Sequence, residues 1–274
     1  MTPLPHDRRD PWDLLAGART VLAVHAHPDD ESLATGALLA ELSARGVRVV
    51  LVTATRGEEG EIVPGSVPAQ STRALEEIRA GEIDAAARTL GIAERHMLGE
   101  PPALAPGAAA RRYRDSGMTW VREGLAGPSP DAGPDSFSLR PMDEATADLA
   151  ALIDAVRPEA VIGYDDAGTY GHPDHVRAHH VSAAASARAG VPMLEVASAQ
   201  DAEGFSWREQ PGSLEAVAAA LACYRTQLTV LGTRPAVAGA AGADAVPAVR
   251  VRHVGGQDEV IAMRTGLRLS GSAR

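Results

Sequence analysis

Two short segments of the chain bring histidines and aspartates together. The first is the run His-Pro-Asp-Asp-Glu at residues 27–31, and the second is the run Tyr-Gly-His-Pro-Asp-His at residues 170–175. Imidazole nitrogens and carboxylate oxygens without a neighbouring thiol suit Zn²⁺ or Fe²⁺. Three such ligands with an open position for water make a hydrolytic site, in which a further carboxylate can act as the base. Aspartate and proline also favour turns, so either run alone could be a simple loop, but two such runs favour a metal site.

The elements that must position these runs alternate between strands and helices. The pattern predicts strand 21–24, helix 32–45, strand 47–53, helix 71–90, helix 143–156, strand 160–164 and a helix from 175 to 189. This rhythm predicts an α/β fold with a Rossmann-like, mostly parallel sheet and helices on both faces. Each histidine-containing run follows a predicted strand, and ligands of such sheets collect at the carboxyl ends of the strands. We therefore expect both runs at the same edge of the sheet.

The chain divides into three expected parts: a lead-in at residues 1–19, a Rossmann-like core at 20–190, and a small C-terminal α/β appendage at 191–274 that packs on the core. Within the core, residues 99–141 are rich in proline, glycine and alanine and lack periodicity, which is typical of a functional excursion. Within the appendage we expect a helix at 213–226 and a pair of strands at 248–254 and 259–263.

Composition excludes several other classes of protein. The 274 residues carry a net charge of −10, which disfavours binding to nucleic acid or to anionic membranes. All 26 basic residues are arginine, so chemistry that needs a lysine is excluded. The single cysteine, Cys223, allows no internal disulfide and no thiolate cluster. The sequence shows no signal peptide at its N-terminal end and no apolar run of ~20 residues, so we expect a cytoplasmic protein that acts on a small molecule. The sequence does not indicate an oligomeric state.

The two runs also resemble a known family. Ala-His-Pro-Asp-Asp-Glu at 26–31 and Gly-His-Pro-Asp-His-Val at 171–176 resemble the zinc-dependent de-N-acetylases of LmbE or PIG-L type. Three further segments look like the branch that deacetylates N-acetylglucosaminyl-inositol in mycothiol biosynthesis: Gly-Glu-Glu-Gly-Glu at 57–61, Arg-Ala-Gly-Glu at 79–82 and Arg-Asp-Ser-Gly-Met at 114–118. The resemblance covers residues 20–190 well. It implies a Rossmann-like fold and hydrolysis of an N-acetyl group on an N-acetylglucosamine-containing small molecule.

The resemblance also implies roles in the reaction. His27, Asp30 and His175 would hold one Zn²⁺ per chain, with Fe²⁺ as an alternative ion. Asp29 would be the general base, and His172 would stabilise the oxyanion and could protonate the leaving amine. The chemistry is consistent with these roles, because an amide needs a polarised carbonyl, an activated water and a proton for the amine. Neighbouring aspartates in an extended turn point in different directions, so one can bind the metal while the other faces the water.

Further residues are implied to act around the metal. Asp174 would orient or tune an imidazole, and Tyr170 would lie over the site and help to polarise the carbonyl. The resemblance further implies that four residues line the pocket for the sugar and the inositol: Glu61, Arg79, Asp115 and Met118.

Two other functions stay open at this point. A mycothiol-conjugate amidase, or another deacetylase of N-acetylglucosamine derivatives, would share the metal site and differ in the acceptor pocket. A non-catalytic, metal-binding Rossmann-like module would not need Asp29, which is present. A dinucleotide-dependent dehydrogenase is disfavoured, because the first strand leads into His-Pro-Asp-Asp-Glu and not into a glycine-rich turn.

Overall fold

Seven β-strands form the central sheet of the computed structural model, which describes residues 10–122 and 125–271. Their order across the sheet is β3-β2-β1-β6-β7-β12-β8. The strands from β3 to β7 in this order are parallel, whereas β12 runs antiparallel to both of its neighbours. The bounds are β1 Thr20–His25, β2 Arg48–Thr53, β3 Glu94–Met97, β6 Ala160–Tyr164, β7 Met193–Val196, β8 Ser206–Glu209 and β12 Arg264–Leu269. The expected Rossmann-like, mostly parallel sheet is confirmed.

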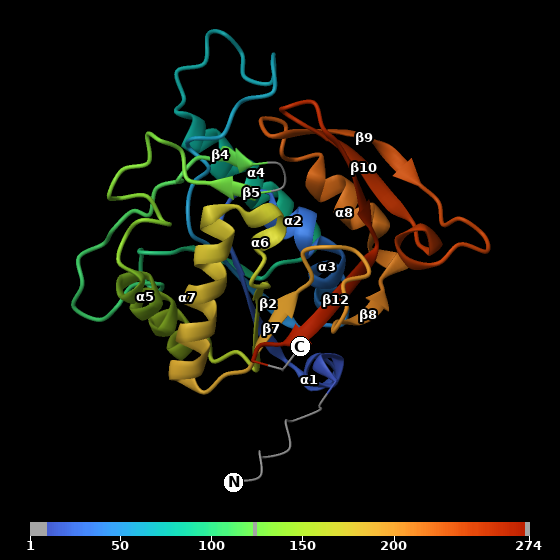
Figure 1. Ribbon diagram of the computed structural model, residues 1–274, viewed down its shortest axis with the longest axis horizontal. Coiled ribbons are helices and arrows are strands. Elements are labelled where there is room, and N and C mark those ends of the chain that lie inside the picture. The colour runs from blue at the N-terminus through green and yellow to red at the C-terminus, as the bar shows by residue number, and fades with distance from the viewer. Residues whose placement is uncertain (1–9, 123–124, 272–274) are drawn as a thin grey trace.

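Helices cover both faces of this sheet and enclose two apolar cores. Because successive side chains of a strand point to opposite faces, Val21 and Ala23 of β1 lie in one core and Leu22 and Val24 in the other. The first core is covered by α1 (Pro11–Gly17), α3 (Gly36–Ala44), α4 (Leu75–Leu90) and α8 (Leu214–Leu221). The second is covered by α5 (Met142–Val156) and α7 (Pro173–Ala189), which lie side by side in Figure 1.

Two smaller sheets flank the central one. Strands β9 (Leu228–Arg234), β10 (Ala248–His253) and β11 (Asp258–Ala262) form an antiparallel sheet beside α8 (Figure 1). A hairpin of β4 (Thr119–Arg122) and β5 (Leu125–Gly127) rises from the excursion at 99–141. Short 3₁₀ turns, η1 (Pro211–Ser213) and η2 (Gly242–Ala245), complete the C-terminal region.

Most predicted elements are confirmed within a few residues, but two predicted helices are wrong in extent. The helix expected at 32–45 is divided into α2 (Asp30–Ala34) and α3, because Thr35 leaves the helical conformation between them. The Thr35 hydroxyl donates to the carbonyl of Glu31, and its oxygen lies 2.9 Å from Nε2 of His25. The helix expected at 213–226 ends at Leu221, and the residues that follow turn toward β9.

The C-terminal third contributes more to the sheet than its sequence indicates. Strands β7, β8 and β12 all come from residues beyond 190, and all three lie in the central sheet. The division into a core at 20–190 and an appendage at 191–274 stays a prediction. Of the expected lead-in at 1–19, residues 1–9 lie outside the described residues, and residues 11–17 form α1.

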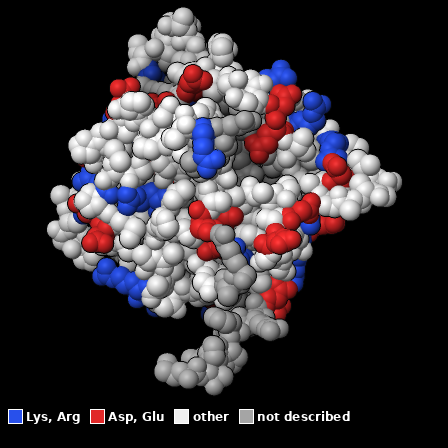
Figure 2. Space-filling view, in the orientation of Figure 1, with Lys and Arg blue, Asp and Glu red and all other residues white. Residues whose placement is uncertain are grey.

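Charges of both signs are mixed over the face shown in Figure 2. Many of the arginines are paired: Arg112 with Glu58 and Glu76, and Arg268 with Glu195, for example. Across residues 10–122 and 125–271, no helix combines the length and the apolar character that a bilayer span needs.

Candidate metal centre

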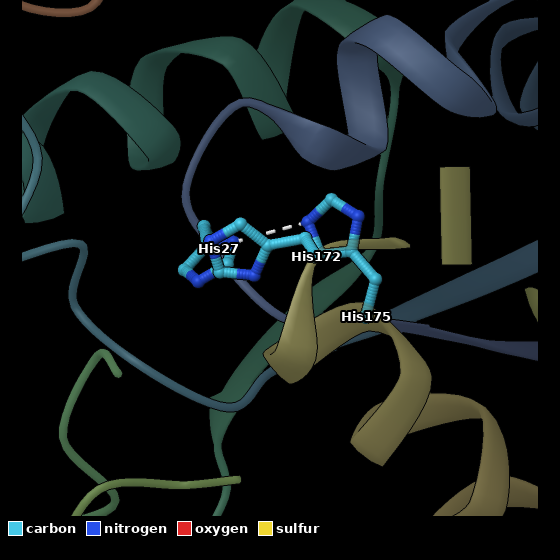
Figure 3. A group of neighbouring side chains, drawn as sticks. All are labelled: His27, His172 and His175. Atoms are coloured by element: carbon cyan, nitrogen blue, oxygen red, sulfur yellow. Dashed lines mark hydrogen bonds between the residues drawn. The ribbon is translucent and has the colours of Figure 1, made fainter. Parts of the chain in front are cut away.

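The two histidine-containing runs meet at the carboxyl edge of the sheet, between β1 and β6. These strands are neighbours, and the order of the strands reverses between them. After β1 the chain continues to β2 and β3 on one side, whereas β6 and then β7 lie on the other side. A crevice at such a switch point is the usual ligand site of an open α/β sheet. His27 follows β1, whereas His172 and His175 lie at the start of α7 (Figure 3).

The side chains of His27, Asp30 and His175 face one another and form a small group, which we call the donor triangle. Nδ1 of His27 lies 3.2 Å from Nε2 of His175 and 3.2 Å from Oδ2 of Asp30, and Nε2 of His175 lies 3.3 Å from Oδ1 of Asp30. Ligands about 2.0–2.1 Å from a tetrahedral zinc ion lie about 3.4 Å from one another, so this donor set fits such an ion. Asp30 is held in place by the backbone N–H of His27 and by the hydroxyl of Tyr164, which donate to Oδ2 at 2.8 Å and 2.7 Å.

The outward nitrogens of both histidines have partners that fix the tautomers. Nδ1 of His175 lies 2.7 Å from the hydroxyl oxygen of Thr169, which itself donates to the carbonyl of Gly168. His175 therefore donates from Nδ1 and leaves Nε2 free as a ligand. Nε2 of His27 lies 3.2 Å from Oδ2 of Asp174 and 3.6 Å from Oδ1 of Asp115, so His27 donates from Nε2 and leaves Nδ1 free. Such hydrogen bonds to the far nitrogen are typical of metal-binding histidines.

The electrostatic field of the site favours a cation. Burial by itself lowers the pKa of His27, but the carboxylates of Asp115, Asp174 and Asp30 outweigh it and hold this pKa well above its usual value. The same carboxylates that attract a proton to the imidazole attract a metal ion in its place. Two other groups of side chains here could also bind a metal ion: His27 with His172 and His175, and His27 with Asp115 and Asp174. In each group the possible ligand atoms, one from each residue, all lie within 4.8 Å of one another.

Asp29 occupies a strained position next to the donor triangle. Its φ of 100° lies in the left-handed region, which costs a residue with a side chain about 1–3 kcal/mol. That Asp29 points in a different direction from Asp30, toward a bound water, stays a prediction. Burial raises the pKa of Asp29 well above its usual value, and the negative charges of Asp30 and Glu31 raise it further. A carboxylate with a raised pKa suits general-base chemistry.

His172, the N-cap residue of α7, lies close to the two other imidazoles. Its ring centre lies 4.6 Å from that of His27 and 4.8 Å from that of His175. Burial lowers the pKa of His172 to about 3, and the neighbouring imidazoles add to this effect, so the ring is neutral. Because Nδ1 accepts a hydrogen bond from the backbone N–H of Asp174, the single ring proton sits on Nε2.

Tyr170 lies at the mouth of the site and is 47% exposed. Its ring centre is 5.9 Å from His172 and 5.7 Å from His175, which places it beside the donor triangle. On the outer side its ring centre is 6.0 Å from that of Trp120, on the hairpin of β4 and β5. Tyr170 therefore lies between the donor triangle and the protein surface.

The residues that the resemblance assigns to the sugar pocket lie in different places. Asp115 is buried beside His27, and its Oδ1 accepts a hydrogen bond from the backbone N–H of Gly117. Met118 is 38% exposed, and the side chain of Glu61 lies at the surface. Arg79 is buried under the loop at 57–61, where its guanidinium donates to backbone carbonyls, including that of Glu61. Their role in binding a sugar stays a prediction.

A polar cavity of about 190 Å³ has Asp115 and Ser116 in its lining. Its lining comes from the excursion at 99–141 together with Glu59 of the loop at 57–61, which we call the acidic loop. The lining includes Arg114, Ser129 and Asp131. Hydroxyl and charged groups of this kind bind polyhydroxylated molecules by hydrogen bonds. The excursion, which shows no periodicity in the sequence, thus lines this cavity and also supplies Asp115, which lies 3.6 Å from Nε2 of His27.

Sequence reasoning missed several residues that hold the site together. Tyr164 supports Asp30, Thr169 fixes His175, and the N–H and hydroxyl of Ser116 both donate to Asp174. The sequence carried one usable signal, because Tyr164 is the last residue of a predicted strand and such residues lie at the ligand edge. Glu31, the last residue of the first run, is completely buried and had no expected role.

One family model and several curated proteins match this chain. The family model described as "PIG-L: GlcNAc-PI de-N-acetylase" matches residues 22–186. The chain is similar to "1D-myo-inositol 2-acetamido-2-deoxy-alpha-D-glucopyranoside deacetylase 1" of Saccharopolyspora erythraea, with 42% identity over 61% of this chain and 54% of that protein. It is also similar to the deacetylase of the same kind from Streptomyces griseus, with 39% identity over 86% of this chain and 67% of that protein. The chain spans about half the length of most of the curated relatives it matches.

A solved structure supports the fold. The chain resembles the N,N'-diacetylchitobiose deacetylase from Pyrococcus horikoshii with a TM-score of 0.55 and 20% identity, over 79% of this chain and 73% of that one. At this identity the likeness concerns the arrangement of the elements and not the chemistry.

Proposed function

The chain belongs to the GlcNAc-PI de-N-acetylase (PIG-L) family, and from that premise we propose that it is a metal-dependent amide hydrolase, which removes the N-acetyl group from an N-acetylglucosaminyl-inositol-type small molecule in mycothiol biosynthesis. One observation carries this proposal. The donor triangle of His27, Asp30 and His175 lies next to Asp29, a carboxylate that is not needed to hold a metal.

The donor set fits one Zn²⁺ per chain, and Fe²⁺ is the alternative ion. His27, Asp30 and His175 would hold it through the nitrogens and the carboxylate that face one another. When bound, a divalent ion supplies a Lewis acid for the acetyl carbonyl and lowers the pKa of water. Asp174 and Asp115 orient His27, and Thr169 orients His175, so the triangle is arranged before the ion enters.

The remaining steps belong to side chains of this protein. Asp29 accepts the proton of the attacking water, for which its raised pKa suits it. His172 carries a proton on Nε2, which can donate a hydrogen bond to the oxyanion, and the proton that Asp29 takes from the water can then reach the nitrogen of the leaving amine. Tyr170, at the mouth, helps to polarise the acetyl carbonyl and limits the access of bulk water.

The substrate assignment has two supports. The curated relatives are named as deacetylases of a glucosaminyl-inositol compound, and the polar cavity beside Asp115 can bind a polyol. Asp115 and Met118 would contact the substrate directly. Glu61 would contact it from the loop at 57–61, whose shape Arg79 maintains.

An acetate-release assay with defined substrates tests this function. The expected order of turnover is N-acetylglucosaminyl-inositol above N-acetylglucosamine, with a mycothiol conjugate cleaved poorly. Preferred cleavage of the conjugate would indicate the amidase instead. A protein that binds one metal ion per chain and hydrolyses none of the three substrates would indicate a non-catalytic module.

A further inference from the structure

The residues between α8 and β9 contact two segments near the site. One is the loop at 27–31, which carries the first histidine-containing run, and the other directly follows the acidic loop at 57–61. We define residues 224–227 (Tyr-Arg-Thr-Gln) as the C-terminal strap. They lie outside the family match at 22–186 and in the third of the chain whose sequence is least informative. Tyr224 and Thr226 are nevertheless almost completely buried, with exposed fractions of 0% and 1%.

The strap contacts the loop at 27–31 on both sides of Asp29. On one side, the side-chain amide of Gln227 donates to the backbone carbonyl of Pro28. On the other side, the hydroxyl of Tyr224 donates to Oε1 of Glu31 at 2.6 Å. Oε2 of the same carboxylate accepts the backbone N–H of Asp29 at 3.3 Å. A chain of hydrogen bonds therefore runs from the strap through Glu31 to the backbone of the proposed base.

The strap also holds the acidic loop at 57–61 through a second network. The backbone N–H and hydroxyl of Thr226 donate to the two carboxylate oxygens of Glu82, at 2.9 Å and 2.6 Å. The hydroxyl oxygen of Thr226 lies 3.4 Å from Nε of Arg79, whose guanidinium donates to the carbonyls of the loop. The carbonyl of Thr226 accepts the N–H of Val63, just beyond the loop.

We infer that the C-terminal strap is a positioning element for catalysis, which fixes Asp29 through Glu31 and Pro28; this inference rests on the proposed function. A strained backbone conformation persists only where its surroundings determine it fully. Asp29 has such a conformation, and the strap supplies contacts to the residue before it and to the side chain two residues after it. Glu31 is then a positioning residue: its buried carboxylate acts on the backbone of Asp29 and not on the substrate.

The substitution Tyr224→Phe tests this inference, because it removes the hydroxyl and keeps the ring in the core. We expect kcat for acetate release to fall roughly 10-fold, since small displacements of a catalytic group have effects of this order or larger. KM and metal content should change little, because the ligand atoms of His27, Asp30 and His175 are held by other partners. Gln227→Ala, at a half-exposed position with less risk to folding, should lower kcat in the same direction.

Two readouts separate positioning from a loss of stability. In an Asp29→Ala background, Tyr224→Phe should lower the residual rate by less than 2-fold, because the group that it positions is gone; an undiminished 10-fold loss there would overturn the inference. Hydrogen exchange of a peptide covering residues 26–33 should be faster in Tyr224→Phe and Gln227→Ala. Ser213→Ala is the matched control, since it removes a buried hydrogen bond from the other end of α8 to the carbonyl of Ala37 and should change neither readout.

The outcomes also distinguish this inference from the proposed function. If the wild type releases acetate and Tyr224→Phe matches it in kcat and exchange, the inference is wrong and the function stands. If the wild type hydrolyses no substrate, the function is wrong, and exchange in the peptide at 26–33 alone decides whether the strap fixes this loop.

Discussion

Replacing Arg79 by methionine tests whether this side chain supports the loop at 57–61 or binds the substrate. Arg79 is 2% exposed, and methionine keeps much of its apolar stem but none of its donors. The carbonyls of Gly60 and Glu61 belong to exposed residues, so water can replace the guanidinium at about 0.5–1.5 kcal/mol each. The carbonyl of Gly57 belongs to a buried residue, and leaving it unpaired costs about 1–3 kcal/mol. Together these losses lower the free energy of unfolding by about 2–6 kcal/mol, with a midpoint of about 4 kcal/mol.

Scanning calorimetry measures this loss directly. In a chain of this size each kcal/mol lowers Tm by about 2–4 °C, so at the midpoint Arg79→Met should melt about 8–16 °C below the wild type. Metal content should stay at the wild-type level, while kcat falls because the loop is no longer held. The control is Arg73→Met, an exposed arginine that donates to the carbonyl of Glu77 and should shift Tm by about 2 °C or less. An unchanged Tm with a raised KM would refute this reasoning and place Arg79 against the substrate.

Other predictions concern the metal and the reaction. Asp29→Ala should keep its metal and lose roughly 10²–10⁴-fold in kcat, whereas Asp30→Ala should lose metal and activity together, as metal analysis and initial rates will show. Asp115→Asn should weaken metal affinity by roughly 10–100-fold in a chelator competition, because Nε2 of His27 loses a carboxylate partner. His172→Ala should retain metal but lose roughly 10²–10³-fold in rate, and wild-type metal affinity with a wild-type rate would remove it from the mechanism. Chelation should abolish acetate release and Zn²⁺ or Fe²⁺ should restore it; full activity in metal-free protein would contradict the proposed chemistry.

The parallel part of the fold could be predicted because its strands carry local signals. Residues 49–52 form an uninterrupted apolar run, and the strand that they form is buried on both faces. Glycines end the helices that precede two other parallel strands: Gly91 follows α4 and Gly190 follows α7. The two histidine-containing runs follow strands of this kind, so their convergence could be predicted from the topology of parallel sheets alone.

The remaining features depend on contacts between distant parts of the chain. The sequence around β12 resembles any short amphipathic strand, and only its partners β7 and β8 place it in the central sheet. The resemblance implies a pocket role for Asp115, but only the folded excursion shows that it is buried beside His27. Tyr224 reads as a core aromatic, and the buried carboxylate of Glu31 gives its hydroxyl a role. Side-chain pairing over such separations leaves no periodic pattern in the sequence.

The two outer strands of the central sheet bear on how the protein avoids aggregation. β3 and β8 are each four residues long and carry charged side chains. Glu94 and Arg95 of β3 are paired with Arg48 and Asp84, and the indole of Trp12 already donates to the carbonyl of Ser206 in β8. Pairing of a second chain with either outer strand would require desolvation of these charged side chains. It would also form few backbone hydrogen bonds, because each outer strand is short. The sheet can therefore keep an apolar centre without inviting edge-to-edge association.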